Sequence, residues 1–173
     1  MRTIPALALS VAVLGGVATW LFLSVGQILI WAAFMAWACF YHSGGDEAAL
    51  RSTIVSNAFG VLVAWATALI IVLVPGGAVF GATLWPSLVV AVTIAVYILA
   101  ARLPAFASIP GTTYGYACTF AFLLQTPDRF DLATLTSASL ANPLLVVPIS
   151  MTIGAFFAYA SAKTAAAITV AAD

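Results

Sequence analysis

Long apolar segments, separated by short polar or turn-forming stretches, dominate the hydrophobic pattern of this chain. There are six of them, at residues 4–23, 27–42, 52–74, 86–101, 104–125 and 142–161. A helix needs about 20 apolar residues to cross the hydrocarbon core of a membrane. Only helices suit these lengths, because every backbone polar group in lipid must be hydrogen-bonded within the protein. The pattern therefore predicts an all-α integral membrane protein with six transmembrane helices.

The composition excludes an ordinary soluble domain. Hydrophobic residues make up 65% of the 173 residues and charged residues only 6%, against about 25% charged residues in soluble domains. The net charge is zero, so the charge gives no indication of a nucleic-acid partner. Cys39 and Cys118 both lie inside apolar segments. We expect them to be small buried side chains and neither a disulfide nor a metal-binding pair.

The basic residues are distributed unevenly between the two expected sides of the membrane. Six spans place both termini on one side, together with Arg2, Arg51, Arg102 and Lys163. The other side holds only Arg129. Since lysine and arginine accumulate on the cytoplasmic side, we expect cytoplasmic termini. The alanine-rich residues 163–173 are expected to form a frayed cytoplasmic tail.

Two parts of the chain resemble each other in the same order. The matches are "AWACF" (36–40) with "GYACT" (115–119), "SNAFGVLVAWA" (56–66) with "SMTIGAFFAYA" (150–160) and, more weakly, "VATWLF" (17–22) with "IAVYIL" (94–99). We expect one membrane domain made of two three-helix halves, residues 1–80 and 81–162. An odd number of spans inverts the second half, as in many transporters and channels. The alternative is that such patterns recur because membrane helices pack through small residues.

The fifth segment carries a helix breaker and several hydroxyl groups. Pro110 and Gly111 predict a break in the fifth helix, with a half-helix over residues 104–109 before it. The polar side chains that follow, which could hydrogen-bond a small solute, are Thr112, Thr113, Tyr116 and Thr119. The alternative is a kinked packing helix, in which Gly111 and Gly115 allow close contact and the threonines bond to their own helix.

Other candidate pore residues lie in the second, third and sixth segments. They are Ser56, Asn57 and Ser150, of which Ser56 and Ser150 are equivalent in the repeat, and the tryptophans Trp31 and Trp37. A polar side chain in a membrane span faces a neighbouring helix or a cavity, so interhelical packing bonds are the alternative. His42, the single histidine, closes the second segment. It is either a pH-sensitive gate or an interfacial residue.

Several chemistries have no signal in the sequence. None of the apolar segments carries a charged residue in its interior, which argues against proton-coupled transport and against a charged substrate. We find no metal-ligand cluster, no nucleophile beside a base and no phosphate-binding loop. The sequence therefore predicts neither an enzyme nor a bound metal or cofactor.

Most of the chain, through about residue 160, resembles a bacterial inner-membrane family, the domain of unknown function 1097. "SIPGTTYGYACTFA" (108–121) is similar to its Pro-Gly-Thr signature, and "WAAF" (31–34) with the following glycines is similar to its second span. The matching positions are Pro110, Gly111, Thr112, Gly115, Thr119, Phe120, Trp31, Phe34, Gly44 and Gly45. The chain departs from the family between Trp37 and His42, where an alignment needs a gap. The resemblance implies an inner-membrane location and no substrate.

These observations favour a channel or facilitator for a small uncharged polar solute such as urea, ammonia or a short amide. The alternatives are a non-transporting membrane protein that binds a partner and an exporter of small aromatic compounds. One chain of 17.9 kDa buries little surface. By analogy with small solute channels we expect a homo-oligomer in the lipid bilayer, with a trimer as the first expectation.

Overall fold

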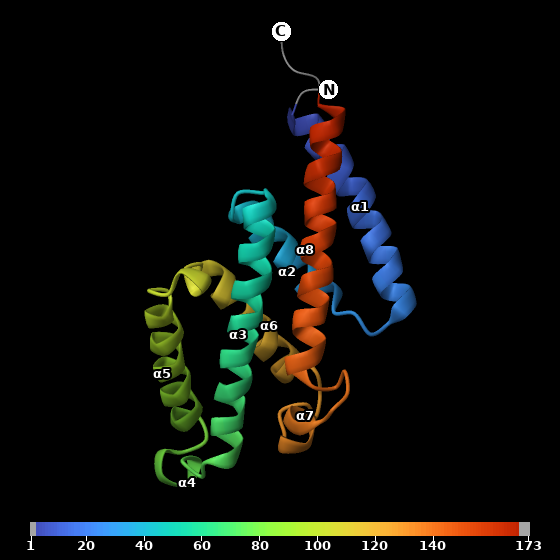
Figure 1. The fold of residues 1–173 in the computed structure, drawn as a ribbon. Coiled ribbons are helices and arrows are strands. Elements are labelled where there is room, and N and C mark those ends of the chain that lie inside the picture. Colours follow the sequence, from blue (N-terminus) through green and yellow to red (C-terminus); the bar gives the residue numbers. More distant parts are fainter. Residues whose placement is uncertain (1–2, 170–173) are drawn as a thin grey trace. The chain divides into compact units, whose positions relative to one another are not determined.

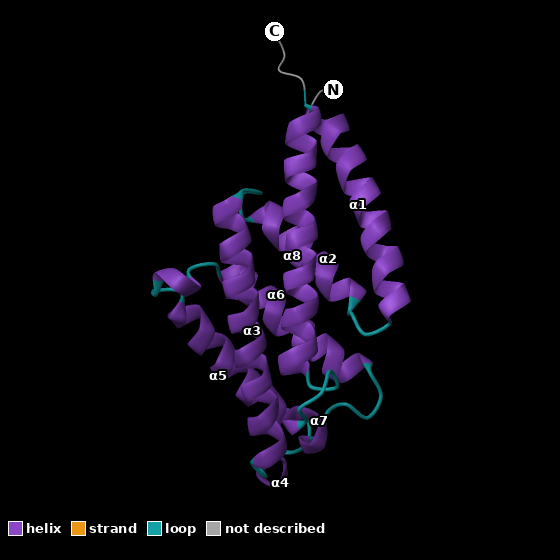
Figure 2. Cartoon of the chain, turned by 45° about the vertical axis from the view of Figure 1, so that its right-hand side comes forward, coloured by secondary structure: helices purple, strands orange, loops and turns teal. Residues whose placement is uncertain are grey.

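The computed structural model describes residues 3–169, which form helices joined by short loops and contain no β-strand (Figures 1 and 2). The helices are α1 (Thr3–Val25), α2 (Ile30–His42), α3 (Glu47–Leu73), α4 (Gly77–Phe80), α5 (Leu84–Ala100), the 3₁₀ helix η1 (Pro104–Phe106), α6 (Ile109–Gln125), α7 (Leu132–Thr136) and α8 (Pro143–Ile168). The prediction of an all-α fold is confirmed.

Helix length separates the six predicted spans into two classes. Helices α1, α3 and α8 have 23, 27 and 26 residues and are apolar enough to cross a membrane, and α5 is a shorter apolar helix. Helix α2 has 13 residues, which at 1.5 Å per residue reach about 20 Å. The hydrocarbon core is about 30 Å thick. The helices are those of a membrane protein, and the count of six spans stays a prediction.

Two helix boundaries differ from the predicted ones. Helix α3 begins at Glu47, because the Oδ1 atom of Asp46 accepts a hydrogen bond from the Ala49 amide at 2.8 Å and caps the first turn. Helix α8 continues to Ile168, so the prediction of a frayed tail is wrong for residues 163–168. Residues 170–173 and Arg2 lie outside the described residues.

The predicted break in the fifth helix is also wrong. Helix α6 begins at Ile109, and Pro110 lies in its first turn. The Ser108 hydroxyl caps this turn by accepting a hydrogen bond from the Gly111 amide at 3.2 Å. A proline costs nothing there, because the first amides of a helix have no intrahelical acceptor. The expected half-helix is only the three-residue η1.

The chain divides into two compact units that do not follow the order of the sequence. Unit 1 combines the chain up to Ile54 with the chain from Ile149 onward, and unit 2 is Val55–Pro148. Both boundaries fall inside a long helix, so each unit contains part of α3 and part of α8. Unit 1 consists mainly of α1, α2 and most of α8, and unit 2 mainly of α5, α6 and most of α3, together with the short α4, η1 and α7.

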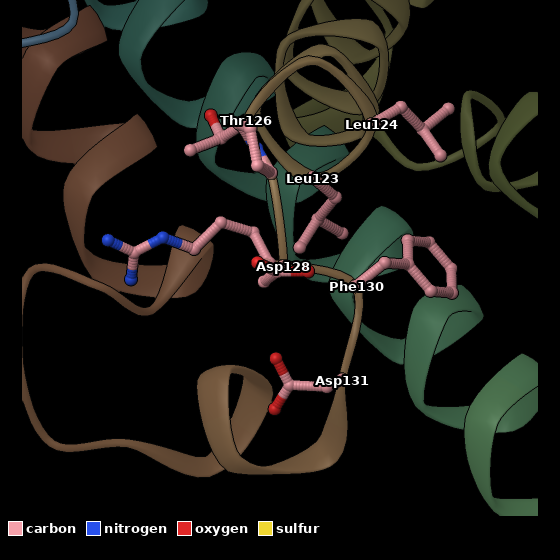
Figure 3. A pocket seen from close by; sticks show the side chains of 8 residues that line it. Leu123, Leu124, Thr126, Asp128, Phe130 and Asp131 are labelled. Carbon is pink, nitrogen blue, oxygen red and sulfur yellow. The ribbon is translucent and has the colours of Figure 1, made fainter.

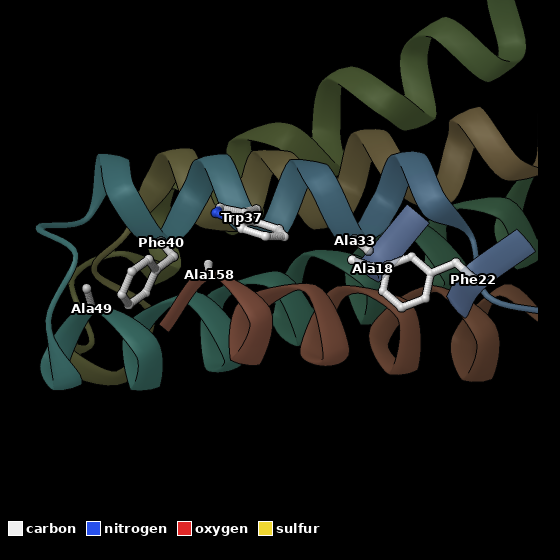
Figure 4. Packing of buried hydrophobic residues seen from close by; sticks show 7 residues of the cluster. All are labelled: Ala18, Phe22, Ala33, Trp37, Phe40, Ala49 and Ala158. Carbon is white, nitrogen blue, oxygen red and sulfur yellow. The ribbon is translucent and has the colours of Figure 1, made fainter. Parts of the chain in front are cut away.

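The core of unit 1 forms where α1, α2, α8 and the first turn of α3 meet. Figure 4 shows its buried side chains, which are Ala18, Phe22, Ala33, Trp37, Phe40, Ala49 and Ala158. The rings of Phe22 and Phe157 meet edge to face with centroids 5.7 Å apart. This contact joins α1 to α8, and the Trp37 ring, stacked on Phe157, joins α2 to α8.

The core of unit 2 forms in the same way from α5, α6 and α3. Its buried members are Ala64, Tyr97 and Tyr116, and the tyrosine rings lie 5.5 Å apart. The partly buried Phe59, Val63, Ile94 and Phe120 surround them. Helix α6, which carries four of the nine predicted pore residues, is therefore held between α5 and α3.

Candidate functional site

In each unit the short helix crosses the long helix at a glycine. A Cβ atom added to Gly60 of α3 would overlap the carbonyl oxygen of Thr112 in α6. A Cβ atom added to Gly154 of α8 would likewise overlap the carbonyl oxygen of Ala33 in α2. Backbone therefore meets backbone at both crossings, as is typical of membrane helices that pack through small residues.

These two contacts are equivalent in the sequence repeat. Gly60 aligns with Gly154, and extending the alignment of Cys39 with Cys118 back along the chain pairs Ala33 with Thr112. The core clusters repeat the relation, because Ala158 and Trp37 in unit 1 align with Ala64 and Tyr116 in unit 2. Helices α1 and α5, which are the first and fourth predicted spans, follow the repeat less closely. Trp20 is 70% exposed, whereas its counterpart Tyr97 is buried.

The crossing in unit 2 contains three buried polar side chains without a hydrogen-bond partner. They are Ser56, Asn57 and Thr112, each at most 2% exposed. The Oγ atom of Ser56, both amide atoms of Asn57 and the Oγ1 atom of Thr112 make no hydrogen bond. Each such group costs about 1–3 kcal/mol relative to a paired one. We call these three residues the α3–α6 polar crossing.

Two glycines of α6 bring this helix close to the polar residues of α3. A Cβ atom added to Gly111 would lie 2.7 Å from the Cβ atom of Ser56. A Cβ atom added to Gly115 would overlap the carbonyl oxygen of Asn57. Gly111 and Gly115 thus serve the close contact of the two helices, as the packing alternative predicted.

The equivalent crossing in unit 1 contains no amide side chain, although the indole Nε1 of Trp37 on α2 also makes no hydrogen bond. Met151, 1% exposed, occupies the position of Asn57, and Ala33 that of Thr112. Ser150 corresponds to Ser56, and its Oγ atom accepts a hydrogen bond from the Leu29 amide at the start of α2, at 3.0 Å. Leucine cannot cap its own helix, so the serine of α8 supplies the missing acceptor.

The other predicted hydroxyl groups of α6 have protein partners. Thr113 donates to the Ile109 carbonyl at 2.9 Å, and Thr119 donates to the Gly115 carbonyl at 3.0 Å. The hydroxyl of Tyr116 lies 3.0 Å from Oγ1 of Thr93. The structure therefore brings Thr112 together with Ser56 and Asn57, and leaves Thr113, Tyr116 and Thr119 in packing bonds.

The two predicted tryptophans lie in different surroundings. Trp37 is buried, with its ring stacked on Phe34 at 5.6 Å and on Phe157 at 6.2 Å. Trp31 is 37% exposed. Sequence reasoning missed Thr93 and Tyr97 of α5, which hydrogen-bond Tyr116 and Thr113. These two residues lie one turn apart on an otherwise apolar helix, and that spacing could have marked them as a polar face in the sequence.

A solvent-open hollow lies at the C-terminal end of α6 (Figure 3). It measures about 420 Å³ and is lined by Leu123, Leu124, Thr126, Pro127, Asp128, Arg129, Phe130 and Asp131. Asp131 caps α7, accepting from the Thr134 amide and the Thr134 hydroxyl, each at 2.9 Å. These bonds hold the pKa of Asp131 below its ordinary value. The carboxylate is thus occupied in building the loop.

Neither His42 nor a metal site adds to the polar crossing. His42 is exposed at the end of α2. Residues 3–169 contain no cluster of three or more histidine, cysteine, aspartate or glutamate side chains that could hold a metal ion.

Comparison with known proteins identifies one family. A family model described as protein of unknown function (DUF1097) matches residues 8–166. The resemblance seen in the sequence is thereby confirmed. Neither a curated protein nor a solved structure matches the chain.

Proposed function

Because the chain belongs to the DUF1097 family, which has no assigned function, we propose a function on the basis of the α3–α6 polar crossing. The protein is a membrane facilitator for a small uncharged polar solute. The observation that carries this proposal is the group of unpartnered polar atoms of Ser56, Asn57 and Thr112. A transport pathway offers such atoms a partner that the resting protein lacks. Selection would then follow from pore diameter and hydrogen-bond pattern.

The chemistry of the crossing favours a neutral solute. Its polar atoms belong to one amide and two hydroxyl groups, which can donate and accept hydrogen bonds but carry no charge. A charged solute at membrane depth needs a compensating charge. Within residues 3–169, the basic and acidic residues lie near the helix ends and in loops.

The proposal includes two inverted three-helix repeats. The paired glycine contacts of Gly60 and Gly154 support this arrangement. So do the unit boundaries, because Ile54 and Pro148, the last residues before each boundary, are equivalent in the same alignment. Inverted repeats commonly form a transport site near the bilayer midplane. The second helix of each repeat packs on the third helix of the other, which makes the two halves interdependent.

The proposed setting is the bacterial inner membrane, with cytoplasmic termini and an oligomer of identical chains. Within unit 1, Arg51 lies in the first turns of α3 and Lys163 in the last turns of α8. The hydroxyl of Tyr41, near the end of α2, lies 2.6 Å from Oγ of Ser161. Both cations therefore belong to the same end of unit 1, which supports the orientation expected from charge.

The proposed facilitator can be tested in proteoliposomes by stopped-flow light scattering. We expect faster permeation of urea, acetamide or another neutral solute than in protein-free vesicles. Thr112→Val should alter that rate, and Thr119→Val is the matched control because its hydroxyl is bonded within α6. A folded, inserted protein that accelerates none of urea, ammonia, acetamide, glycerol and water would refute the facilitator.

A second candidate is a non-transporting membrane protein that binds a partner. The packing bonds of Thr113, Tyr116 and Thr119 favour it, because they are what a dry helix bundle requires. In that case Thr112→Val and Ser56→Ala would change stability and leave every solute rate at the background value.

A further inference from the structure

We propose that the α3–α6 polar crossing binds a small primary amide or urea, and that within residues 3–169 only unit 2 holds a binding site of this kind. This inference rests on the proposed function and narrows it. Its core is Asn57, which is 2% exposed and lacks a partner for both its carbonyl oxygen and its amino group.

The geometry of an amide selects its ligand. The Oδ1 and Nδ2 atoms of Asn57 lie in one plane, one accepting and the other donating hydrogen bonds. A primary amide or urea presents the complementary pair, so both atoms can be satisfied by one solute molecule. A single water or ammonia molecule can bridge the two atoms only through bent hydrogen bonds, whereas an amide pairs with both through nearly linear ones. The hydroxyls of Ser56 and Thr112 remain to bond the other end of the solute.

The internal repeat supplies the argument for a single site. Unit 1 has the same glycine crossing, but Met151 and Ala33 replace the amide and one hydroxyl. A membrane crossing of this geometry can therefore pack without the amide and the threonine hydroxyl. Unit 1 does leave the Trp37 indole and the Thr53 hydroxyl unpartnered, but neither sets an acceptor beside a donor in one plane as the Asn57 amide does. That planar pair makes the polar set of unit 2 an addition to a shared scaffold.

The described conformation is the closed form of this site. Each unpartnered atom exposes less than 1 Å² to solvent, so a solute reaches it only when α3 and α6 separate at their contact. The Gly60 and Gly115 contacts with α6 and α3 backbone limit how easily this happens. Binding is accordingly expected to be weak, with millimolar solute needed.

The test uses acetamide and acetone as probes of nearly the same shape, since acetone lacks the amino group. The apparent Tm of the detergent-solubilised full chain is measured with each probe, for the wild type and for Asn57→Met. Methionine is chosen because it occupies the equivalent buried position 151. We expect acetamide to raise the wild-type Tm relative to acetone, and the variant to lose this difference. Without solute, Asn57→Met should melt at the same or a higher temperature, because it removes an unpaired amide.

Thr112→Val provides a second variant that is isosteric, and Thr119→Val provides a paired-hydroxyl control. The Thr112 variant should weaken the acetamide effect, and the control should retain it. Equal shifts with acetamide and acetone, or a shift retained in Asn57→Met, would overturn the amide site. So would a Tm of Asn57→Met lowered by many degrees, because the amide would then be paired in the folded protein.

The same variants distinguish this inference from the proposed function. An acetamide-specific shift without solute flux would support the amide site and refute the facilitator. Flux of glycerol or water without any acetamide-specific shift would support the facilitator and overturn the amide site.

Discussion

Gly60 of α3 lies directly against the carbonyl oxygen of Thr112 in α6, with no room for a side chain between them. This contact sets the distance between the two helices and places the Thr112 side chain in a buried position beside α3. The one-turn repeat of small residues Ser56, Gly60 and Ala64 on α3 keeps the whole face narrow. Close packing and the polar crossing are therefore two consequences of one helix face.

Gly60→Ala should destabilise the protein by about 1–3 kcal/mol, the usual cost of overpacking a close-packed interior. The added methyl group meets backbone atoms, which cannot move out of its way as a flexible side chain can. The measurement is the apparent Tm in detergent, by circular dichroism at 222 nm. The matched control is Gly16→Ala in α1, where a Cβ atom meets nothing within 4 Å. The control should be neutral or stabilising, because alanine favours a helix over glycine.

Gly154→Ala should reproduce the Gly60→Ala effect in unit 1. Its added methyl group would overlap the Ala33 backbone, the counterpart of Thr112. Comparable losses of Tm for the two variants are expected if the crossings are equivalent in energy as they are in geometry. A loss confined to one of them would mean that the crossings, although alike in sequence, do not contribute alike to stability.

Ser150→Ala should destabilise the start of α2 by about 1 kcal/mol, because it leaves the Leu29 amide without its acceptor. Amide hydrogen exchange of residues 29–33 measures this locally and should speed up. Ser87→Ala is the control, since that exposed hydroxyl only bonds the Thr83 carbonyl of its own turn. Unchanged exchange in Ser150→Ala would show that the Leu29 amide gains nothing from α8.

The hydrophobic pattern was enough to predict the helical class and the position of most helices, because lipid leaves the backbone few alternatives. It failed at Pro110, which is equally compatible with a break inside a helix and with a first turn. The Ser108 cap decides between them. The sequence also marked four hydroxyl residues on α6 without separating Thr112 from the rest. That separation depends on which threonines donate to a carbonyl of α6 itself and which hydroxyls meet α5, and neither can be predicted from the sequence.

The α7 cap predicts a pH dependence at the end of α6 in unit 2. Because the hydrogen bonds of Asp131 lower its pKa from 3.8, the ionised carboxylate stabilises the loop above that pH. Stabilisation is lost as the pH falls through the lowered value, since a protonated carboxyl accepts the Thr134 amide bond poorly.

Trp65 reports on this loop, because its indole Nε1 donates to the Leu135 carbonyl of α7 at 2.8 Å. In protein labelled with 5-fluorotryptophan, the ¹⁹F signal of Trp65, assigned with Trp65→Phe, should shift only at acidic pH, below about pH 4. Asp131→Asn should show an altered signal already at pH 7, because the carboxamide keeps an oxygen for the Thr134 amide but replaces the acceptor of the Thr134 hydroxyl with an amino group. Asp128→Asn is the control, and it should titrate like the wild type. A Trp65 signal that is constant to pH 2 in the wild type would mean that α7 holds its position without the Asp131 carboxylate.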